Sequence, residues 1–498
     1  MAEPDCPGCR ARDAIIQDLR ALIAQLQARI AALEERVAVA EERACAAEER
    51  ARVAEERVRE LEARLNQNSS NSSKPPSTDP PNAPKRPAKP PTGRKPGGQP
   101  GHAGHHRTRL PPSRIQHTEH YYPATCEHCQ APLPQSAQPG DPEPKWHQVA
   151  EVPVAPAVVT EHQAHGSLCP GCGHCTWAEI PAEIRAHGFG PNLTALVAYL
   201  SGCFRGSKRI IEELIEGLFH IPLSLGTVAN LEQETSAALQ QPYQEAQQAV
   251  QAASVKNADE TGWYQAGKRR WLWMAATQTV AFFKICTGRG KAAFQELLGE
   301  IVTGVVSSDR WSAYNDLDLA QRQLCWSHLK RDFQKWLDRG GAGKDLGQAG
   351  LEAARRLFGL WRDFRQGGLD RPALQAALLP VQDELQAALA AGASCADRRV
   401  QRFCRNVLAV YPALWTFARI EGVEPTNNHA ERTLRRAVIW RKVSFGNHSA
   451  AGCRFAERIL TVVQTLRLQQ RPVLDYLRQA IVAQRAGHPA PRLCLVGD

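Results

Sequence analysis

The sequence lacks any run of 18 or more apolar residues, which excludes a transmembrane helix of ordinary length. Its first residues, from Met1 to Asp5, also lack the basic-then-apolar order of a secretory signal peptide. These two absences predict a cytoplasmic protein with no membrane partner. Disulfides are rare in a reducing cytosol, so the 15 cysteines indicate metal ligands and buried thiols.

Negative charge is scarce relative to positive charge. The 498 residues include 61 Lys and Arg against 51 Asp and Glu, which gives a formal net charge of +10. This balance favours a polyanionic partner, nucleic acid before a membrane, although a generally basic soluble protein would show the same balance. The length exceeds what one hydrophobic core supports, so roughly three or four units are expected.

The first unit, residues 1–65, carries a heptad pattern. From Ile16 to Leu65 apolar residues recur at alternating steps of three and four. This period predicts a left-handed coiled coil through which the chain forms a homo-oligomer, and a single solvated helix is the alternative. A preceding CxxC pair, Cys6 and Cys9, is either incidental or completes a metal site across a dimer.

Residues 66–115 have almost nothing to bury. They are rich in Pro, Ser, Gly, Lys and Arg, a composition typical of an extended or disordered basic linker. Its cationic side chains, Lys95 among them, are candidates for lying along DNA phosphates. A solvated tether is the alternative, and the two roles are compatible.

Residues 116–182 contain two CxxC pairs, and four thiolates at the corners of a tetrahedron form a structural Zn²⁺ site. The predicted ligands are Cys126, Cys129, Cys169 and Cys172. The 39 residues between the pairs exceed the usual spacing of about 15–20, so other ligands stay open. These substitutes are His128, His165, His174 and Cys175.

Residues 183–250 are expected to be helical. An amphipathic stretch at 207–219 is followed by a short turn and a second helical stretch that begins after Ser224. Helix, short turn and helix resemble a helix-turn-helix, with Ser224 as the cap of the second helix. Two packed helices are also common without DNA, so both interpretations stay open.

Residues 251–450 are expected to form a catalytic core. Strand-like runs alternate here with helical ones, and a long helical stretch follows at about 327–425. This order predicts a mixed α/β fold that carries a helical insertion. The remaining residues, 451–498, are expected to form a helical tail with core-like apolar spacing.

Three carboxylates in this core are placed for metal chemistry. Asp259 and Asp309 follow strand-like runs and are expected to end their strands, where a rigid sheet presents ligands at one edge. Glu431 lies on a basic helix that Thr426 or Asn427 is expected to cap. Carboxylates suit Mg²⁺, and two such ions can cut DNA by activating the attacking oxygen and stabilising the leaving one. For any single acid, a surface charge is the ordinary explanation.

Several motifs follow one another along the chain. Besides the two CxxC pairs they are LNQNSSNSSKPPS at 65–77, KPGGQPGH at 95–102, ADETG at 258–262, SDRWSAY at 308–314, CWSHLKR at 325–331 and TNNHAER at 426–432. In these motifs and in their order, the chain resembles the large catalytic subunit of transposases of the insertion sequence sixty-six family, which are of the DDE type. The resemblance covers nearly all of the chain after residue 65.

The resemblance implies an RNase H-like fold with a DDE triad of Asp259, Asp309 and Glu431, two Mg²⁺ ions and a zinc-binding domain. It implies cleavage at the ends of an insertion sequence and transfer of the freed 3′-OH ends to target DNA. Asp259 and Asp309 are expected to hold one ion, and Asp259 and Glu431 the other. The implied partners are terminal inverted repeats, target DNA and small accessory proteins of the same element, in the bacterial nucleoid.

Further basic residues near the triad are candidates for DNA contacts. They are His328, Lys330, Arg331, Arg432, Arg435 and Arg436. A capping role is the alternative for His328, and Glu260 is expected to point away from its neighbour in the triad. The competing interpretation of the whole chain is a non-catalytic, DNA-binding regulatory protein from a decayed element.

Overall fold

The computed structural model describes residues 7–69, 71–72, 108–152 and 157–494. The predicted DNA contact of Lys95 and the possible metal site of Cys6 and Cys9 lie outside this part of the chain, since Lys95, Cys6 and the side chain of Cys9 are not among the described residues. The chain divides into two compact units: Met1–Ala83, His187–Ser207 and Ala229–Asp498 make up the first, and Pro84–Ala186 and Lys208–Val228 the second. No helix among the described residues is long and apolar enough to cross a bilayer.

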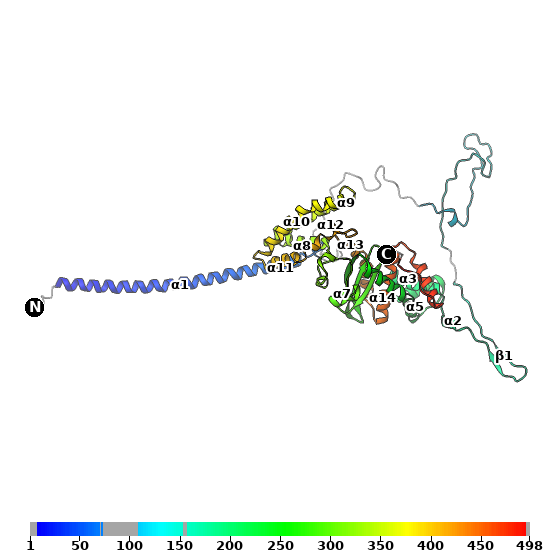
Figure 1. The fold of residues 1–498 in the computed structure, drawn as a ribbon, viewed down its shortest axis with the longest axis horizontal. Coiled ribbons are helices and arrows are strands. Elements are labelled where there is room, and N and C mark those ends of the chain that lie inside the picture. Colours follow the sequence, from blue (N-terminus) through cyan, green and yellow to red (C-terminus); the bar gives the residue numbers. More distant parts are fainter. Residues whose placement is uncertain (1–6, 70, 73–107, 153–156, 495–498) are drawn as a thin grey trace. The chain divides into compact units, whose positions relative to one another are not determined.

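The first unit begins with one uninterrupted helix, α1 (Pro7–Leu65), drawn in blue in Figure 1. Ala, Glu, Arg and Leu, which favour helix strongly, dominate its sequence. The apolar seam finds no partner within the described chain: Leu19 is 52% exposed and Ile23 is 54% exposed. The seam is therefore free to pair with another helix, and self-association stays a prediction.

The core of the first unit is a five-stranded sheet in the order β5-β4-β3-β6-β7. Its strands are β3 (Val255–Gln265), β4 (Lys268–Ala276), β5 (Ala281–Cys286), β6 (Val305–Ser308) and β7 (Arg322–Leu324). The first three form an antiparallel meander, and β6 and β7 run parallel to β3. Between β5 and β6 lies α7 (Lys291–Leu298), and the short turns η3 (Ser312–Tyr314) and η4 (Leu319–Gln321) precede β7.

The expectation that Asp259 ends its strand is wrong. Asp259 lies within β3 and pairs with Met274 of β4. The apolar run does stop at Ala258, but the antiparallel hairpin with β4 continues for several more residues and keeps the backbone extended. Asp309 does come directly after β6, as expected.

Helices that precede and follow the strands along the sequence pack into the hydrophobic core of the sheet. They are α3 (Pro191–Phe204), α6 (Gln240–Ala252), α13 (Asn428–Ser444), α14 (Ala450–Leu468) and α15 (Val473–Arg485). The sequence assigned residues 183–250 and 451–498 to separate parts, whereas these helices pack with the sheet in one unit. Their apolar faces are buried against the strands, so these helices and the sheet share one hydrophobic core.

The side chains of α14 cover the outer edge of β5. Ala281 and Phe283 donate their backbone N–H groups to the hydroxyls of Thr465 and Thr461, each at 3.0 Å. Ile285 donates its own to Glu457. An edge strand otherwise presents unpaired backbone groups that invite aggregation. Here a helix takes the place of a sixth strand, as Figure 1 shows for α14 beside the sheet.

A second hydrophobic core belongs to the helices between β7 and α13. They are α8 (Trp326–Arg339), α9 (Lys344–Arg365), α10 (Arg371–Ala393), α11 (Arg398–Leu408) and α12 (Thr416–Arg419), with the short turns η5 (Gly341–Gly343) and η6 (Tyr411–Leu414). Val305 and Leu324, from β6 and β7, are part of this core. The helical segment is therefore packed onto the two parallel strands that flank the carboxylates.

The second unit has little regular structure. A hairpin of β1 (Gly166–Leu168) and β2 (Cys175–Trp177) encloses one CxxC pair. Its helical elements are η2 (Pro112–Arg114), α2 (Ala182–Arg185), α4 (Lys208–Phe219) and the first turn of α5 (Leu225–Ala238). Ser224 accepts the backbone N–H of Thr227 at 3.1 Å, which is the cap expected at the start of the second helix. DNA recognition by this helix pair stays a prediction.

Candidate active site

The parallel pairing of β3 and β6 brings Asp259 and Asp309 together. Val255 pairs with Val305, and Asn257 pairs with Ser307. This ladder ends two residues before Asp259 on β3 and two residues before Asp309, so both acids follow it at the same end. The two acids are far apart in sequence, and the sheet alone makes them neighbours.

The start of α13 is tied to the same edge of the sheet by Asn427. Its amide donates to the backbone oxygen of Ala258 at 2.7 Å, and its carbonyl accepts from Asn257 at 2.8 Å. Asn427 occupies the N-cap position, but its side chain does not cap the helix. The prediction that the Asn427 side chain caps the helix is therefore wrong, because that side chain is hydrogen-bonded to β3 instead. Glu431 lies in the first turn of this helix. The hydrogen bond from Asn427 to Ala258 holds the start of the helix beside the residue that precedes Asp259.

Electrostatic interactions link Asp259 to the acids around it. Burial raises the pKa of the Asp259 carboxyl well above its ordinary value, and the charge of neighbouring Glu260 adds to this effect. The charges of Asp309 and Glu431 raise the same pKa further. A buried carboxylate among like charges is unfavourable without a compensating cation. An all-oxygen set of donors in this state fits a hard divalent cation such as Mg²⁺.

The three acids do not make a single three-ligand cluster. Among the described residues, the only such group with donor atoms within 4.8 Å of one another is Cys325, His328 and Glu431. The expected sharing of two ions requires Asp309 and Glu431 each to reach Asp259, and it does not require them to reach each other.

Side chains from the first two turns of α8 lie beside Glu431. Its Oε1 atom lies 3.7 Å from Nδ1 of His328 and 3.6 Å from Nη2 of Arg331. Both Oε1 and Nδ1 are buried and have no hydrogen-bond partner among the described residues. Burial and the charge of Arg331 lower the pKa of His328, so its imidazole is neutral at pH 7. Glu431 therefore has an oxygen atom that is paired by charge with Arg331 but accepts no hydrogen bond within the described residues.

Cys325 was not among the residues singled out from the sequence, and Asn427 was singled out only as a possible helix cap. Cys325 is buried, and its sulfur accepts the backbone N–H of Asn427 at 3.1 Å. Burial raises the pKa of this thiol, so it is protonated at neutral pH. Both residues lie inside recognised motifs, next to His328 and Glu431. Their roles follow only from the hydrogen bonds that they form in the folded structure.

Glu260 takes part in a different network from Asp259. Its carboxylate accepts from the hydroxyl of Tyr314 at 2.7 Å and forms an ion pair with Arg289 at 2.6 Å. The guanidinium of Arg289 lies 3.8 Å from the ring centroid of Trp311, whose indole donates to the backbone oxygen of Arg289. Asp309 in turn accepts the backbone N–H of Trp311 at 2.8 Å. The network fixes the turn that carries Asp309.

The other predicted DNA contacts lie on exposed surface. Lys330 is exposed on α8, and Arg432, Arg435 and Arg436 are exposed on α13. Burial and the charges of Arg467 and Arg205 lower the pKa of Arg436. One guanidinium nitrogen of Arg467 is buried without a hydrogen-bond partner. Arg436 therefore belongs to a group of cations that suits an anion.

The four predicted zinc ligands form two separate turns. Backbone N–H groups of Cys129 and His128 lower the pKa of Cys126, and those of Gly171 and Cys172 lower the pKa of Cys169. Thiolates stabilised in this way suit a metal ion. The described residues contain no three-ligand group that includes either pair, so the structure does not bring the pairs together.

Comparisons with known proteins identify the family of this chain. Residues 188–454 match the model of a family described as "Transposase IS66 family", and residues 7–108 match a "Family of unknown function (DUF6444)". Two proteins of Sinorhizobium fredii are similar: uncharacterized protein y4qI, 24% identical over 255 residues, and uncharacterized protein y4hP, 25% identical over 373 residues. The first alignment covers 45% of this chain and 46% of its relative, and the second covers 65% of each. The chain thus spans less than two thirds of either relative.

Proposed function

Because this chain belongs to the IS66 transposase family, we propose that it is a DNA transposase of the DDE type. It would cleave the ends of an insertion sequence and transfer the 3′-OH ends to target DNA. The observation that carries the proposal is the parallel pairing of β3 with β6 just before Asp259 and Asp309, with the helix of Glu431 tied to β3. The strand order, with a meander followed by two parallel strands, supports an RNase H-like fold.

The chain's own residues supply the binding groups. Asp259 and Asp309 would hold one Mg²⁺ ion, and Asp259 and Glu431 the other. When bound, the two ions would activate the attacking oxygen and stabilise the leaving one. Asn427 positions Glu431 by holding α13 against β3.

The cations around the acids have a different task. Arg331 near Glu431, and Arg436 with its arginine neighbours, would receive DNA phosphates and orient the strand. Neutral His328 adds no positive charge at pH 7 and would limit the access of water to Glu431. This arrangement places negative charge where the metals bind and positive charge around it.

The remaining modules would assist in holding DNA and protein partners. We infer a structural Zn²⁺ ion that draws Cys126, Cys129, Cys169 and Cys172 together, since each CxxC turn already stabilises a thiolate. Self-association through α1 would pair two catalytic units. Metal analysis tests the zinc proposal: a Cys126→Ser variant should lose one Zn²⁺ per chain, and an unchanged zinc content would contradict it.

The direct test of function uses purified protein, Mg²⁺ and DNA that carries the terminal repeats of the element. Wild type should nick the repeat ends, and Asp309→Ala should bind the same DNA without nicking it. Asp345→Ala is the matched control, because Asp345 is an exposed acid at the start of α9. If wild type bound the ends but never cut them, the regulatory interpretation would replace ours. If Asp309→Ala cut as well as wild type, the active-site assignment would fail.

A further inference from the structure

The end of α1 is joined to the helical segment by polar contacts. Glu60 accepts from Arg399 of α11 at 2.9 Å, and Asn71 donates to Asp338 of α8 at 2.9 Å. The guanidinium of Arg339, whose side chain is 8% exposed, lies 3.7 Å from Glu56. These contacts define a seam between the last turns of α1 and the end of α8.

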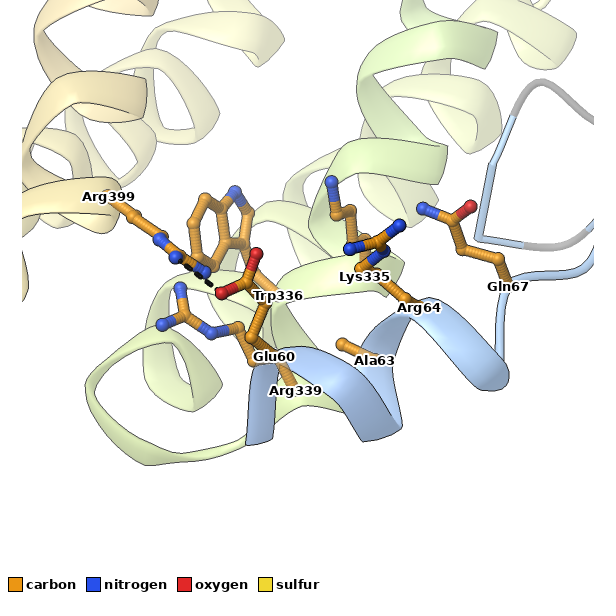
Figure 2. A pocket seen from close by; sticks show the side chains of 8 residues that line it. All are labelled: Glu60, Ala63, Arg64, Gln67, Lys335, Trp336, Arg339 and Arg399. Carbon is orange, nitrogen blue, oxygen red and sulfur yellow. Dashed lines mark hydrogen bonds and ion pairs between the residues drawn. The ribbon is translucent and has the colours of Figure 1, made fainter. Parts of the chain in front are cut away.

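A cavity of about 130 Å³ opens in this seam, as Figure 2 shows. Its lining residues are Glu60, Ala63, Arg64, Gln67, Lys335, Trp336, Arg339 and Arg399. Four of these side chains are cationic and one is a carboxylate. The volume corresponds to roughly four water molecules at about 30 Å³ each, which suits a phosphate-sized anion.

Two of the four cations in this cavity are paired with acids. Arg399 pairs with Glu60 at 2.9 Å, and Arg339 pairs with Asp397 at 3.2 Å and with Glu56 at 3.7 Å. Arg64 and Lys335 line the same cavity and form no ion pair within the described part of the chain. Two like charges in one cavity repel each other, and an anion between them removes that repulsion.

A second cavity of about 530 Å³ continues along the seam. It shares Arg339 with the first and is lined also by three further arginines and two acids: Arg52, Arg59, Arg398, Glu56 and Asp397. Two successive cavities in which cations outnumber acids suit a polymer of phosphates better than a single small anion. Any such polymer would run along the last turns of α1.

We propose that the seam between α1 and α8 binds the backbone phosphates of a DNA strand, with Arg64 and Lys335 holding one phosphate. The identity of the polymer rests on the proposed function, whereas the anion site rests on the geometry of the seam. The end of α1 thereby contributes to substrate binding as well as to self-association.

The experiment measures DNA affinity of the full chain without divalent metal, at several salt concentrations. The double variant Arg64→Gln/Lys335→Gln should bind about tenfold more weakly, and its salt slope should fall by about one, since the two residues hold one phosphate and each phosphate contributes about 0.9. The matched control, Arg43→Gln/Lys344→Gln, removes the same charge from α1 and α9 outside the cavity. It should keep the wild-type slope.

Two further variants and one competitor complete the test. Arg64→Lys/Lys335→Arg retains both charges and should retain affinity, provided that circular dichroism shows all variants folded. Equal slopes for wild type and the double glutamine variant, or equal losses in that variant and the control, would overturn the proposal. If inorganic phosphate stabilised only wild type while the DNA slopes stayed equal, the site would take a free anion and the DNA proposal would fail. Because Asp309→Ala should show the full slope, loss of cutting and loss of this site are separate results.

Discussion

The two ends of α8 lie in opposite electrostatic surroundings. Its first two turns carry His328 and Arg331 beside a carboxylate edge, which we define as Asp259, Asp309 and Glu431. Its last turns carry Lys335 and Arg339 in the basic cavity beside α1. At about 1.5 Å per residue, the 14 residues of the helix span roughly 20 Å.

The contrast shows what each site lacks. The carboxylate edge concentrates negative charge and is incomplete without cations, while the basic cavity concentrates positive charge and is incomplete without an anion. In the proposed function, a DNA strand bound together with divalent metal ions would supply the cations for the first site and the anion for the second. The two sites also differ in origin, because strand register builds the first and a docked helix end builds the second.

The largest expected effect is at the carboxylate edge. Asp259→Asn should lower strand cleavage on the order of 10³-fold, because it removes preorganised charge at the reacting centre. The same change should raise the melting temperature of the metal-free protein, since a buried carboxylate among like charges is unfavourable. Nicking assays and thermal melts in a chelator measure the two effects. A variant that cuts normally, or melts lower than wild type without metal, would contradict the electrostatic account.

The next effect concerns the residue that ties α13 to β3. Asn427→Ala should lower cleavage by about 10–100-fold, as loss of an outer-shell partner typically does. It should also lower the free energy of unfolding by about 1–3 kcal/mol, because buried backbone and amide groups lose their partners. The adjacent exposed residue provides the control, Asn428→Ala. Similar losses in both variants would show that the hydrogen bonds to β3 do not position Glu431.

A buried acid outside both sites sharpens the comparison. Burial raises the pKa of Glu457, which accepts from the backbone of Ile285 on β5. The stability that this acid contributes is complete below the unfolded pKa and is lost as pH rises through the folded pKa. Glu457→Gln should therefore stabilise the protein relative to wild type at pH 8, with a smaller advantage at pH 4. Denaturant unfolding at the two pH values measures this, and an advantage that grows toward low pH would reverse the sign.

The smallest effect is expected in the basic cavity. Glu60→Gln removes its one carboxylate and weakens a partly exposed ion pair with Arg399. The change in the free energy of unfolding should stay within about 1 kcal/mol. DNA affinity at low salt should rise a few-fold, because the net charge of the cavity becomes more positive. Weaker DNA binding by this variant would show that Glu60 matters for holding α1 in place more than for charge.

Sequence patterns predicted much of the fold. The heptads of α1, the alternation of strands and helices after residue 251, and the helical stretch before α13 each follow from local periodicity. The strand of Asp259 was predicted too short, because its length depends on the hairpin with β4. The role of Asn427 was missed, because a helix cap and a bond to a distant strand use the same amide.

The sequence by itself indicated which residues are candidates for the chemistry and where most helices and strands lie, since residue type and period are local properties. Only the tertiary structure decided that the strands before Asp259 and Asp309 pair, that Glu431 lies beside His328 and Cys325, and that the end of α1 meets α8. Such neighbours depend on strand register and helix packing, which bring together residues that no local pattern relates.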